Sequence, residues 1–408
     1  MRDFVTILAD TVCDFLRMLP LRDRIVFESN PEFADNTYCV YRYLVDYKHI
    51  DENYKIVWLV EDKNHVSPPA EMKNTTFQNY QKNGKTLWER LKYHYYINTS
   101  RGLIYCNRNL GKKRRKQFSL CLQHGMPLKA SNGGYCIHDQ CDRCLCVSAF
   151  FADHYHKDFD ISYEKMFFCP FPRTDYLFSD RDVRAELGLA GFDKVLIWMP
   201  TYRKSAAEKM KSFNIEGTAT GIPCLETEED VLRLDAFLRE KNSLVLFKPH
   251  PVQPIDSVLR EKLTNIRFID NAWLAEKGVQ LYELLGKTDG LITDYSSVYY
   301  DYLLTDRPVG LTVDDYDEYI GKRGFVYDDP FEVLKGEHIT DADGLIAYID
   351  EVVRGEDPYS EDREIVKDRI YSTVRQVGSA TAYVSELFWK ELQNNRGGVG
   401  FGGSGDGV

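Results

Sequence analysis

Residues 291–298 read Leu291-Ile292-Thr293-Asp294-Tyr295-Ser296-Ser297-Val298, and the fold can be worked out from this stretch. β-Prone residues run into an acid, an aromatic ring and two adjacent hydroxyls, and apolar residues at helical spacing begin at Val298. The pattern predicts a strand, a tight turn and a helix, with Ser296 and Ser297 at the helix N-terminus. Unpaired backbone N–H groups and the helix dipole favour phosphate there, but serine and aspartate are also ordinary N-cap residues. The stretch alone leaves both interpretations open.

The same alternation of strands and helices extends to both sides of this stretch. Short apolar strands separated by helices require right-handed crossovers, so we expect an α/β fold with parallel sheets. Strands are predicted at 24–29, 55–60, 102–106, 118–122, 195–199, 244–247, 266–269, 291–293 and 308–311, and helices at 36–47, 87–96, 228–241, 281–285 and 381–392.

The length bounds the number of domains. A chain of 408 residues is long for one core and sufficient for two domains of ordinary size. Gly188 and Gly191 interrupt the pattern between the two alternating series. The expected parts are an N-terminal domain over 1–188, a C-terminal domain over 189–380, a closing helix over 381–396 and a flexible glycine-rich tail over 397–408.

Composition excludes several classes of protein. The net charge of -11 argues against broad nucleic-acid binding. No apolar run approaches the length that spans a bilayer, and the N-terminus lacks a signal-peptide pattern, so we expect a cytoplasmic protein. An amphipathic helix over 4–19 and the run Lys112-Lys113-Arg114-Arg115-Lys116 could contact the inner face of an anionic membrane. Their alternatives are a helix docked on the first domain and a solvated loop.

The ten cysteines are too sparse for a disulfide scaffold in a chain of this length, so reduced thiols are expected. One cluster contains Cys136, His138, Cys141, Cys144 and Cys146. Its CxxC pair could hold zinc. However, 144–148 also reads as a buried strand, and no second CxxC lies at a zinc-ribbon distance. The strand pattern and the missing second CxxC argue against a zinc site. The sequence alone leaves metal binding by this cluster open.

Two histidines follow predicted strands. The ligand crevice of an open parallel sheet lies beyond the carboxyl ends of its strands. His124 is followed by Gly125, which lets the backbone turn sharply, and an imidazole there suits proton transfer near neutral pH. His250 stands in Lys248-Pro249-His250-Pro251, where two prolines restrict the chain and fix the direction of the ring. We therefore expect both histidines to be functional.

Three strand-end segments, taken in order, resemble one known family. They are His124-Gly125-Met126-Pro127-Leu128-Lys129, Lys248-Pro249-His250-Pro251 and Thr293-Asp294-Tyr295-Ser296-Ser297, with supporting pieces at Pro200-Thr201-Tyr202-Arg203, Glu28-Ser29, Asp35-Asn36 and Arg323-Gly324-Phe325. The ordered set resembles the CDP-glycerol glycerophosphotransferases, the family of teichoic acid primases and polymerases and of related capsule polymerases. The resemblance covers residues 24–329. Gln123 and Met126 depart from the residues usual in that family.

The resemblance implies a GT-B-like architecture, in which two Rossmann-like domains with parallel sheets face a central cleft. It implies transfer of glycerol phosphate from CDP-glycerol to a hydroxyl of a lipid-linked or polymeric acceptor, with release of CMP, in teichoic acid or capsule-type polymer synthesis. Because no carboxylate cluster indicates bound magnesium, we expect neither a metal nor a cofactor.

The resemblance also implies roles for individual residues. His124 resembles the family's base, which takes the proton from the attacking hydroxyl. His250, Lys248 and Arg203 would surround the diphosphate and offset charge on the leaving phosphate. Ser296 and Ser297 would hold a phosphate in line. The other predicted substrate-binding residues are Gly125, Lys129, Thr201 and Asp294.

The motifs leave the alcohol of the donor and the acceptor open. CDP-ribitol carries the same CDP end as CDP-glycerol, and a nucleotide sugar could serve the same fold. A catalytically silent nucleotide-binding module is the alternative from another class, although binding alone does not require a base. An NAD-dependent oxidoreductase is excluded because no Gly-x-Gly-x-x-Gly turn follows the first strand.

Overall fold

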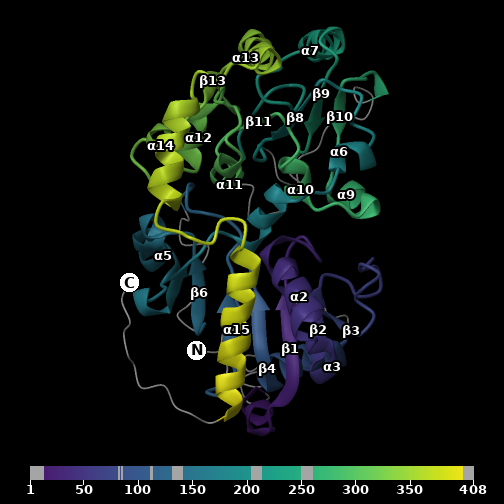
Figure 1. The fold of residues 1–408 in the computed structure, drawn as a ribbon, viewed down its shortest axis with the longest axis vertical. Helices are drawn as coiled ribbons and strands as arrows, with labels where there is room; N and C mark the ends of the chain where they lie inside the picture. The colour runs from purple at the N-terminus through teal and green to yellow at the C-terminus, as the bar shows by residue number, and fades with distance from the viewer. Residues whose placement is uncertain are drawn as a thin grey trace. The chain divides into compact units, whose positions relative to one another are not determined.

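The computed structural model describes residues 13–80, 83, 86–110, 114–130, 141–203, 214–249 and 261–397. These residues divide into two compact units, whose helices and strands are labelled in Figure 1. Unit 1 contains the described residues of Met1–His124, Tyr135–Arg173 and Ser379–Val408, and unit 2 those of Gly125–Gly134 and Thr174–Gly378. Each unit is therefore assembled from separate parts of the chain.

Unit 1 is built on a seven-stranded parallel sheet. Its strands are β1 Arg22–Glu28, β2 Lys55–Val60, β3 Thr75–Asn79, β4 Ser100–Tyr105, β5 Phe118–Cys121, β6 Arg143–Cys146 and β7 Met166–Phe168. They lie in the order β3-β2-β1-β4-β5-β6-β7, so the direction of winding reverses between β1 and β4. The inner strands are buried along most of their length, as expected of a sheet covered on both faces.

Helices cover this sheet. The α-helices of unit 1 are α2 Asp35–Lys48, α3 Ile50–Asn53, α4 Leu87–Thr99, α5 Ala152–Phe159 and α15 Ala380–Gly397, and its 3-10 turns include η2 Ala149–Phe151 and η3 Tyr163–Lys165. α2 buries Tyr41 edge-on against Trp58 of β2, and Trp58 in turn stacks on Phe27 of β1. α15 packs beside α2 and β5, so the end of the chain completes the core of the first unit.

Unit 2 repeats the design with six parallel strands. They are β8 Lys194–Met199, β9 Ser243–Phe247, β10 Ile266–Phe268, β11 Gly290–Thr293, β12 Val309–Thr312 and β13 Glu337–Ile339. The order β10-β9-β8-β11-β12-β13 is that of a doubly wound nucleotide-binding sheet, and it reverses between β8 and β11. Ligands of such sheets bind beyond the carboxyl ends of the strands at this reversal.

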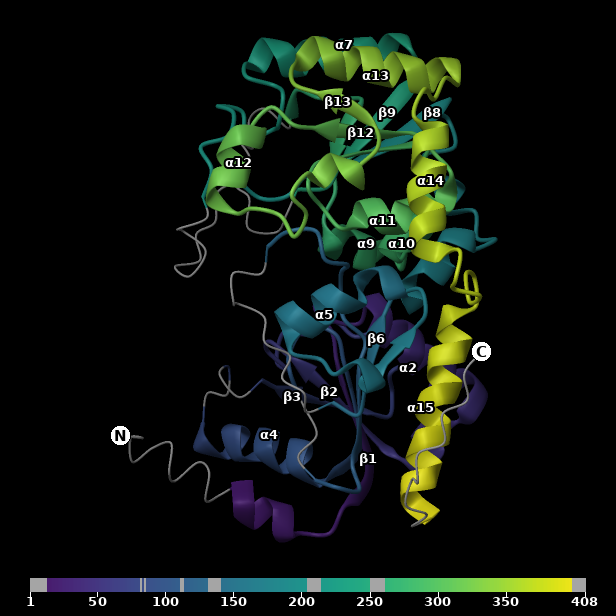
Figure 2. The ribbon, with the colours of Figure 1, turned by 90° about the vertical axis from the view of Figure 1, so that its left-hand side faces the viewer.

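The helices of unit 2 are mostly short. They are α6 Val183–Glu186, α7 Glu228–Glu240, α9 Asn271–Lys277, α10 Leu281–Leu285, α11 Val298–Tyr302, α12 Tyr316–Lys322, α13 Ala342–Arg354 and α14 Ser360–Tyr371, with 3-10 turns η6 Leu303–Thr305 and η7 Pro330–Glu332. α7 and α13 lie side by side (Figure 2); α7 packs on β9 and α13 on β13, and the apolar residues of both helices belong to one core cluster. A Thr227–Asp230 capping box begins α7.

The predicted strands and helices are present with nearly the same ends, so the α/β prediction with parallel sheets is confirmed. Three strands were not predicted: β3, β7 and β13. All three are edge strands with partly exposed residues, and so they lack the continuous apolar run that identifies an inner strand. The chain passes between the units after His124, Gly134, Arg173 and Gly378, whereas the sequence suggested one boundary after Gly188.

Two further predictions concern the ends of the chain. Residues 13–18 are helical, and the first part of the amphipathic helix predicted over 4–19 lies outside the described residues, as does most of the tail over 397–408. None of the described helices is both long and apolar enough to cross a membrane.

Candidate functional site

His124 lies on a turn at the carboxyl end of β5 in unit 1. The preceding residue, Gln123, is buried and has a φ of 56°, in the left-handed region that side chains disfavour. The imidazole of His124 is exposed at this turn, and its Nδ1 lies 3.3 Å from the carbonyl oxygen of Cys106, the residue after β4. Because a carbonyl only accepts, this contact favours the ring with its proton on Nδ1. Nε2 then keeps its lone pair and can take a proton.

Buried side chains hold the backbone on both sides of this histidine. Asn36 Nδ2 donates to the carbonyl of Gln123 at 2.8 Å, and Arg173 Nη1 donates to the carbonyl of His124 at 2.7 Å. Arg173 also forms an ion pair with Asp35 at 2.8 Å. Asp35-Asn36 is one of the supporting motifs of the family resemblance. Arg173 was not predicted, because nothing in a sequence indicates which distant backbone carbonyl a side chain will reach.

Glu28 fixes the loop that carries Cys106. Its buried carboxylate, at the end of β1, accepts backbone N–H groups of Cys106, Asn107 and Arg108 at 2.9–3.2 Å. Burial raises the pKa of Glu28, and the three backbone hydrogen bonds oppose that rise. Glu28 therefore ties β1 to the loop after β4 at the reversal point of the first sheet and positions the carbonyl that faces His124.

A buried charge network occupies the reversal point of the second sheet. Asp294, after β11, is fully buried and accepts the backbone N–H and the hydroxyl of Thr201, at 2.9 and 2.8 Å. Arg203 Nη1 donates to the same carboxylate at 2.7 Å, and its other nitrogens bind Asp315. Burial raises the pKa of Asp315 to about 6, although Arg203 opposes the rise. Thr201, Arg203 and Asp294, all predicted as substrate-binding, are thus brought together and bound to one another.

Two lysines of unit 2 have no ion pair with any residue in the described part of the chain. Lys129 pairs by its backbone with Phe325, and Ala130 N donates to Gly324 O at 3.2 Å. Burial lowers the pKa of Lys129 to about 8; Arg203 and Arg323 also lower it, and Asp294 opposes them. Burial likewise lowers the pKa of Lys248, which follows β9, against the opposing charge of Asp270. A bound anion would stabilise both ammonium groups.

The two serines of the opening stretch lie beside Gly125. Ser297 is the N-cap residue of α11 but makes no side-chain cap hydrogen bond. A Cβ at position 125 would lie only 2.8 Å from Ser297 Oγ, so glycine permits this close approach. α11 has only five residues, and its dipole is accordingly small. Ser296 and Ser297 are half-buried, and His250 lies outside the described residues.

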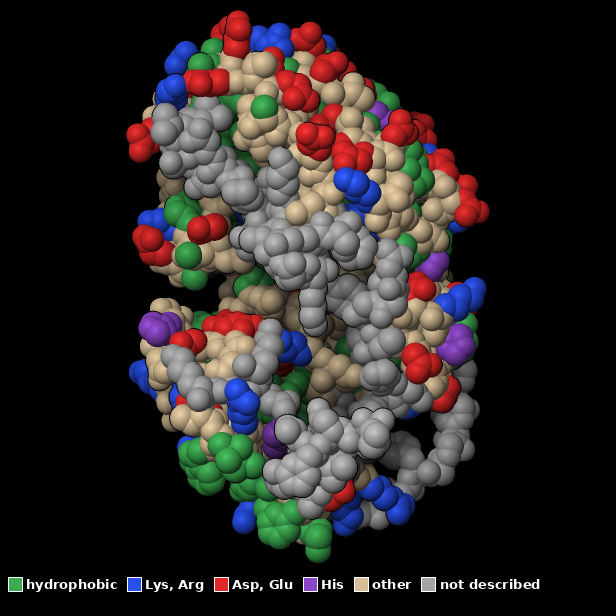
Figure 3. Space-filling model, turned by 180° about the vertical axis from the view of Figure 1, so that it is seen from behind, with side chains coloured by type: hydrophobic (Ala, Val, Ile, Leu, Met, Phe, Trp, Pro, Cys, Tyr) green, Lys and Arg blue, Asp and Glu red, His purple; other side chains and the backbone are tan. Residues whose placement is uncertain are grey.

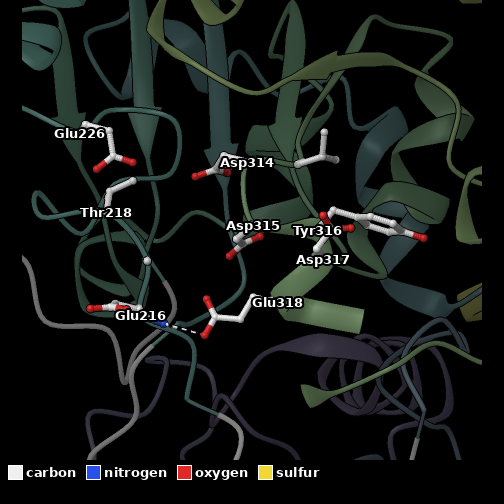
Figure 4. Close-up of a pocket in the computed structure, with 10 residues that line it drawn as sticks. Glu216, Thr218, Glu226, Asp314, Asp315, Tyr316, Asp317 and Glu318 are labelled. Atoms are coloured by element: carbon white, nitrogen blue, oxygen red, sulfur yellow. Dashed lines mark hydrogen bonds between the residues drawn. The ribbon is translucent and has the colours of Figure 1, made fainter. Parts of the chain in front are cut away.

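An acidic cavity of about 580 Å³ lies next to the charge network in unit 2. Its carboxylates come from the loop before α7 and from the segment after β12 (Figure 4): Glu216, Glu226, Asp314, Asp315, Asp317 and Glu318. Asp315 is also the partner of Arg203, so the cavity and the network share a residue. No local pattern in the sequence indicates this cavity. A cluster of negative charges repels phosphate and offers acceptors to hydroxyl and amine donors.

The cysteine cluster is only partly described, because Cys136 and His138 lie outside the described residues. Cys141, Cys144 and Cys146 are buried. Among described residues, no group of three or more His, Cys, Asp or Glu side chains is arranged to hold a metal ion. Burial raises the pKa of Cys146 to about 12, so its thiol stays protonated at neutral pH.

Comparison with known proteins finds one family and several relatives. A protein-family model described as CDP-Glycerol:Poly(glycerophosphate) glycerophosphotransferase matches residues 13–390. The teichoic acid ribitol-phosphate primase of Bacillus spizizenii is 28% identical over 48% of this chain and 46% of its own length. The teichoic acid poly(glycerol phosphate) polymerase of Staphylococcus epidermidis is 24% identical over 90% of this chain and 51% of its own. The chain thus spans about half the length of these relatives.

The fold also matches solved structures. The wall teichoic acid polymerase TagF superimposes with a TM-score of 0.71 at 20% identity, covering 96% of this chain and 95% of that one. A variant of it with CDPG gives a TM-score of 0.69 at 21% identity, covering 94% of both chains. This likeness shows the fold alone, and it confirms the predicted GT-B-like α/β class.

Proposed function

Because the chain belongs to the CDP-glycerol:poly(glycerophosphate) glycerophosphotransferase family, we propose that it transfers glycerol phosphate from CDP-glycerol to a hydroxyl of a lipid-linked or polymeric acceptor. The acceptor oxygen attacks the phosphorus that bears glycerol, the P–O bond of the diphosphate breaks, and CMP leaves. The product is a phosphodiester of the kind found in teichoic acids. One observation carries the proposal: an exposed imidazole at a strand end whose Nδ1 faces a backbone carbonyl.

His124 is the proposed general base. With the Nδ1 proton directed to the Cys106 carbonyl, Nε2 accepts the proton of the attacking hydroxyl. The imidazolium formed in this step keeps its Nδ1 hydrogen bond, so the ring need not rotate during the reaction. General-base catalysis of this kind is worth about 100- to 10,000-fold in rate.

The diphosphate is proposed to bind Lys129 and Lys248. Each ammonium is removed from water without an ion pair to a described residue, so an anion relieves the cost of burial. Ser296 and Ser297 add hydroxyl donors beside Gly125, and His250 is proposed to join them. Positive groups fixed before the reaction offset the charge that develops on the leaving phosphate.

The backbone that forms the donor site is proposed to be held in place by Thr201, Arg203 and Asp294. The guanidinium of Arg203 is already bound by Asp294 and Asp315, so its proposed role is to hold the two loops together and not to bind the diphosphate. The acidic cavity beside Asp315 disfavours the diphosphate. Its carboxylates suit the ribose hydroxyls of the donor, which are hydrogen-bond donors.

The alcohol carried by the donor has a second candidate. The ribitol-phosphate primase matches at higher identity than the poly(glycerol phosphate) polymerase, although over a shorter part of the chain. Incubation with CDP-glycerol or CDP-ribitol and a lipid-linked acceptor, followed by measurement of CMP release, decides between them. Release from CDP-glycerol supports the first proposal and release from CDP-ribitol alone supports the second. Donor binding without release from either would indicate a silent nucleotide-binding module.

Contact with an anionic membrane is proposed for one surface of unit 1. Phe15, Met18, Leu87 and Trp88 expose 62–82% of their surfaces, and Figure 3 shows apolar side chains gathered at the lower end of the view. Such an exposed apolar group is unusual in a protein without a partner for it. It fits a protein whose acceptor is held in a membrane.

Contacts within unit 1 join this apolar surface to the basic run. Arg17 of the helical segment donates to Asn98 of α4 at 3.2 Å, so the segment lies beside α4, which carries Leu87 and Trp88. Arg114 donates to the carbonyl of Leu19, just after the same segment. Residues 112 and 113 of the basic run lie outside the described residues. Apolar and basic groups close together suit the interface of an anionic bilayer.

A further inference from the structure

The turn that carries His124 has a backbone conformation that its local sequence disfavours. Gln123 has a φ of 56°, which non-glycine residues seldom adopt unless neighbouring groups impose it. Asp35, the first residue of α2, also lies in the left-handed region, with a φ of 63°. Asn36, the neighbour of Asp35, donates to the carbonyl of Gln123, so a tertiary contact joins the two segments that carry these residues. This kind of local strain is frequent at functional sites.

Arg173 supplies the central contact. Its side chain is 7% exposed, and a single nitrogen, Nη1, donates to the carbonyl of His124 at 2.7 Å and to Asp35 Oδ1 at 2.8 Å. The backbone N–H of Arg173 donates to Asn36 Oδ1 at 3.2 Å, and Asn36 Nδ2 donates to the carbonyl of Gln123. The two consecutive carbonyls of the turn are therefore held by the side chains of two residues, Asn36 and Arg173, which are joined through the backbone N–H of Arg173.

The segment that carries Arg173, at the start of the 3-10 helix η4 Pro172–Phe178, is fixed independently. Cys169 N donates to the carbonyl of Cys146 at 3.2 Å, which extends the β6–β7 pairing. Thr381 Oγ1, on α15, donates to the carbonyl of Pro172 at 3.0 Å. The guanidinium carbon of Arg173 lies 4.7 Å from the centre of the Phe171 ring. Arg173 is thus a rigid support from which the turn is held.

We propose that Arg173, with Asp35 and Asn36, is a positioning residue that sets the orientation of the His124 imidazole. With the carbonyl of His124 held, the ring keeps its Nδ1 on the Cys106 carbonyl and presents Nε2 as the base. Asp35 balances the positive charge of the guanidinium, so the cation does not oppose protonation of the imidazole. This inference rests on the proposed function, because it assigns the support of the proposed base.

Arg173→Met tests the proposal, with Arg173→Lys as the conservative variant. Arg143→Met is the matched control, because Arg143 also donates to a carbonyl, that of Glu164 at 2.8 Å, in the same unit. The first readout is the tautomer of His124, measured by NMR of protein labelled with ¹⁵N-histidine and assigned by loss of the signal in His124→Gln. The second is kcat and the donor KM for CMP release.

We expect the wild type and Arg143→Met to show His124 with its proton on Nδ1 at high pH. Arg173→Met is expected to lose that preference and to lose about 100-fold in kcat, the effect of misplacing a catalytic group by about 1 Å, with an unchanged donor KM. Arg173→Lys keeps a cation near Asp35 and is expected to lie between the two. If Arg173→Met does not fold, the lysine variant decides by the same signals.

A wild-type tautomer in a folded Arg173 variant would overturn the proposal, whatever its activity. Equal losses of kcat in Arg173→Met and Arg143→Met would also overturn it, because both would then reflect general damage. The failure of the proposed function is recognised separately, as an absence of CMP release by the wild type from either donor. In that case the NMR signal of His124 still decides whether Arg173 positions the ring.

Discussion

Arg203 Nη1 lies 2.7 Å from Asp294 Oδ2, and both side chains are buried. The pair joins the loop after β8 to the loop after β11, the two strands between which the second sheet reverses its winding. Thr201 completes the set by donating twice to the same carboxylate. The network therefore fixes the backbone of unit 2 at the sheet edge where nucleotide ligands are expected.

Asp294→Asn should destabilise the protein strongly. The change places an NH2 group where the carboxylate accepts from Thr201 and Arg203, so a buried donor loses its acceptor while Asp315 still compensates Arg203, which costs about 1–3 kcal/mol. Urea unfolding measures the loss. Asp343→Asn is the control, because Asp343 pairs with Arg233 at 2.6 Å on the surface, where a pair is worth about 0.2–1 kcal/mol. Equal losses in the two variants would contradict the structural role assigned to Asp294.

Gly125→Ala should lower activity through Ser297. The new Cβ would lie 2.8 Å from Ser297 Oγ, so either the hydroxyl rotates or the two segments separate. Ser297→Gly removes the clashing atom, and the double variant should recover part of the loss caused by alanine. A double-mutant cycle on kcat/KM should give a coupling of about 1 kcal/mol. Additive effects would mean that the two residues do not act through this contact.

Donor binding should depend on pH through Lys129. Its pKa is lowered to about 8, so the ammonium that attracts the diphosphate loses its proton as the pH rises through that value. The unfolded chain keeps the proton up to a pH of about 10.4, so the same shift makes stability increase with pH between about 8 and 10. The donor KM should therefore rise above pH 8.

Two variants of Lys129 check this assignment. Lys129→Met should have a raised KM at every pH and should lose the rise near pH 8. Lys129→Arg stays charged throughout this range, so its KM should not rise near pH 8. A pH dependence retained in Lys129→Met would place the titrating group elsewhere.

The sequence predicts a strand or helix where its residues carry a clear local pattern. β8, with Val195-Leu196-Ile197-Trp198, has the unbroken apolar run of an inner parallel strand and was found at once. β3, with Thr75-Thr76-Phe77-Gln78-Asn79, is an edge strand whose residues are partly exposed, and so it lacks that run. α13 was not predicted, although its buried residues Leu345, Ile349 and Val352 recur at helical spacing.

The candidate site divides in the same way. Short motifs beside strand ends predicted His124, Lys248 and Asp294 as site residues, because residue type and chain position carry that signal. The sequence could not show that Thr201 and Arg203 donate hydrogen bonds to the Asp294 carboxylate, because these contacts depend on which loops meet in the fold. The acidic cavity also joins segments far apart in the chain, and no local pattern indicates it.

Membrane binding should depend on the exposed apolar surface of unit 1. Trp88→Glu introduces a negative charge at a ring that is 64% exposed and should lower flotation with vesicles that contain anionic lipid. The exposed apolar residue Ile365, on α14 of unit 2, is 65% exposed and serves as the control in Ile365→Glu. Equal flotation of the two variants and the wild type would remove the membrane contact from the account.

The transfer reaction itself is tested most directly with CDP-glycerol labelled in the glycerol and a synthetic lipid-linked acceptor. Wild-type protein should move the label into the acceptor through a phosphodiester and release CMP in equal amount. His124→Ala should bind the donor normally but transfer about 100- to 10,000-fold more slowly. Labelled acceptor formed by His124→Ala at the wild-type rate, or none formed by the wild type with either CDP-glycerol or CDP-ribitol, would contradict the account.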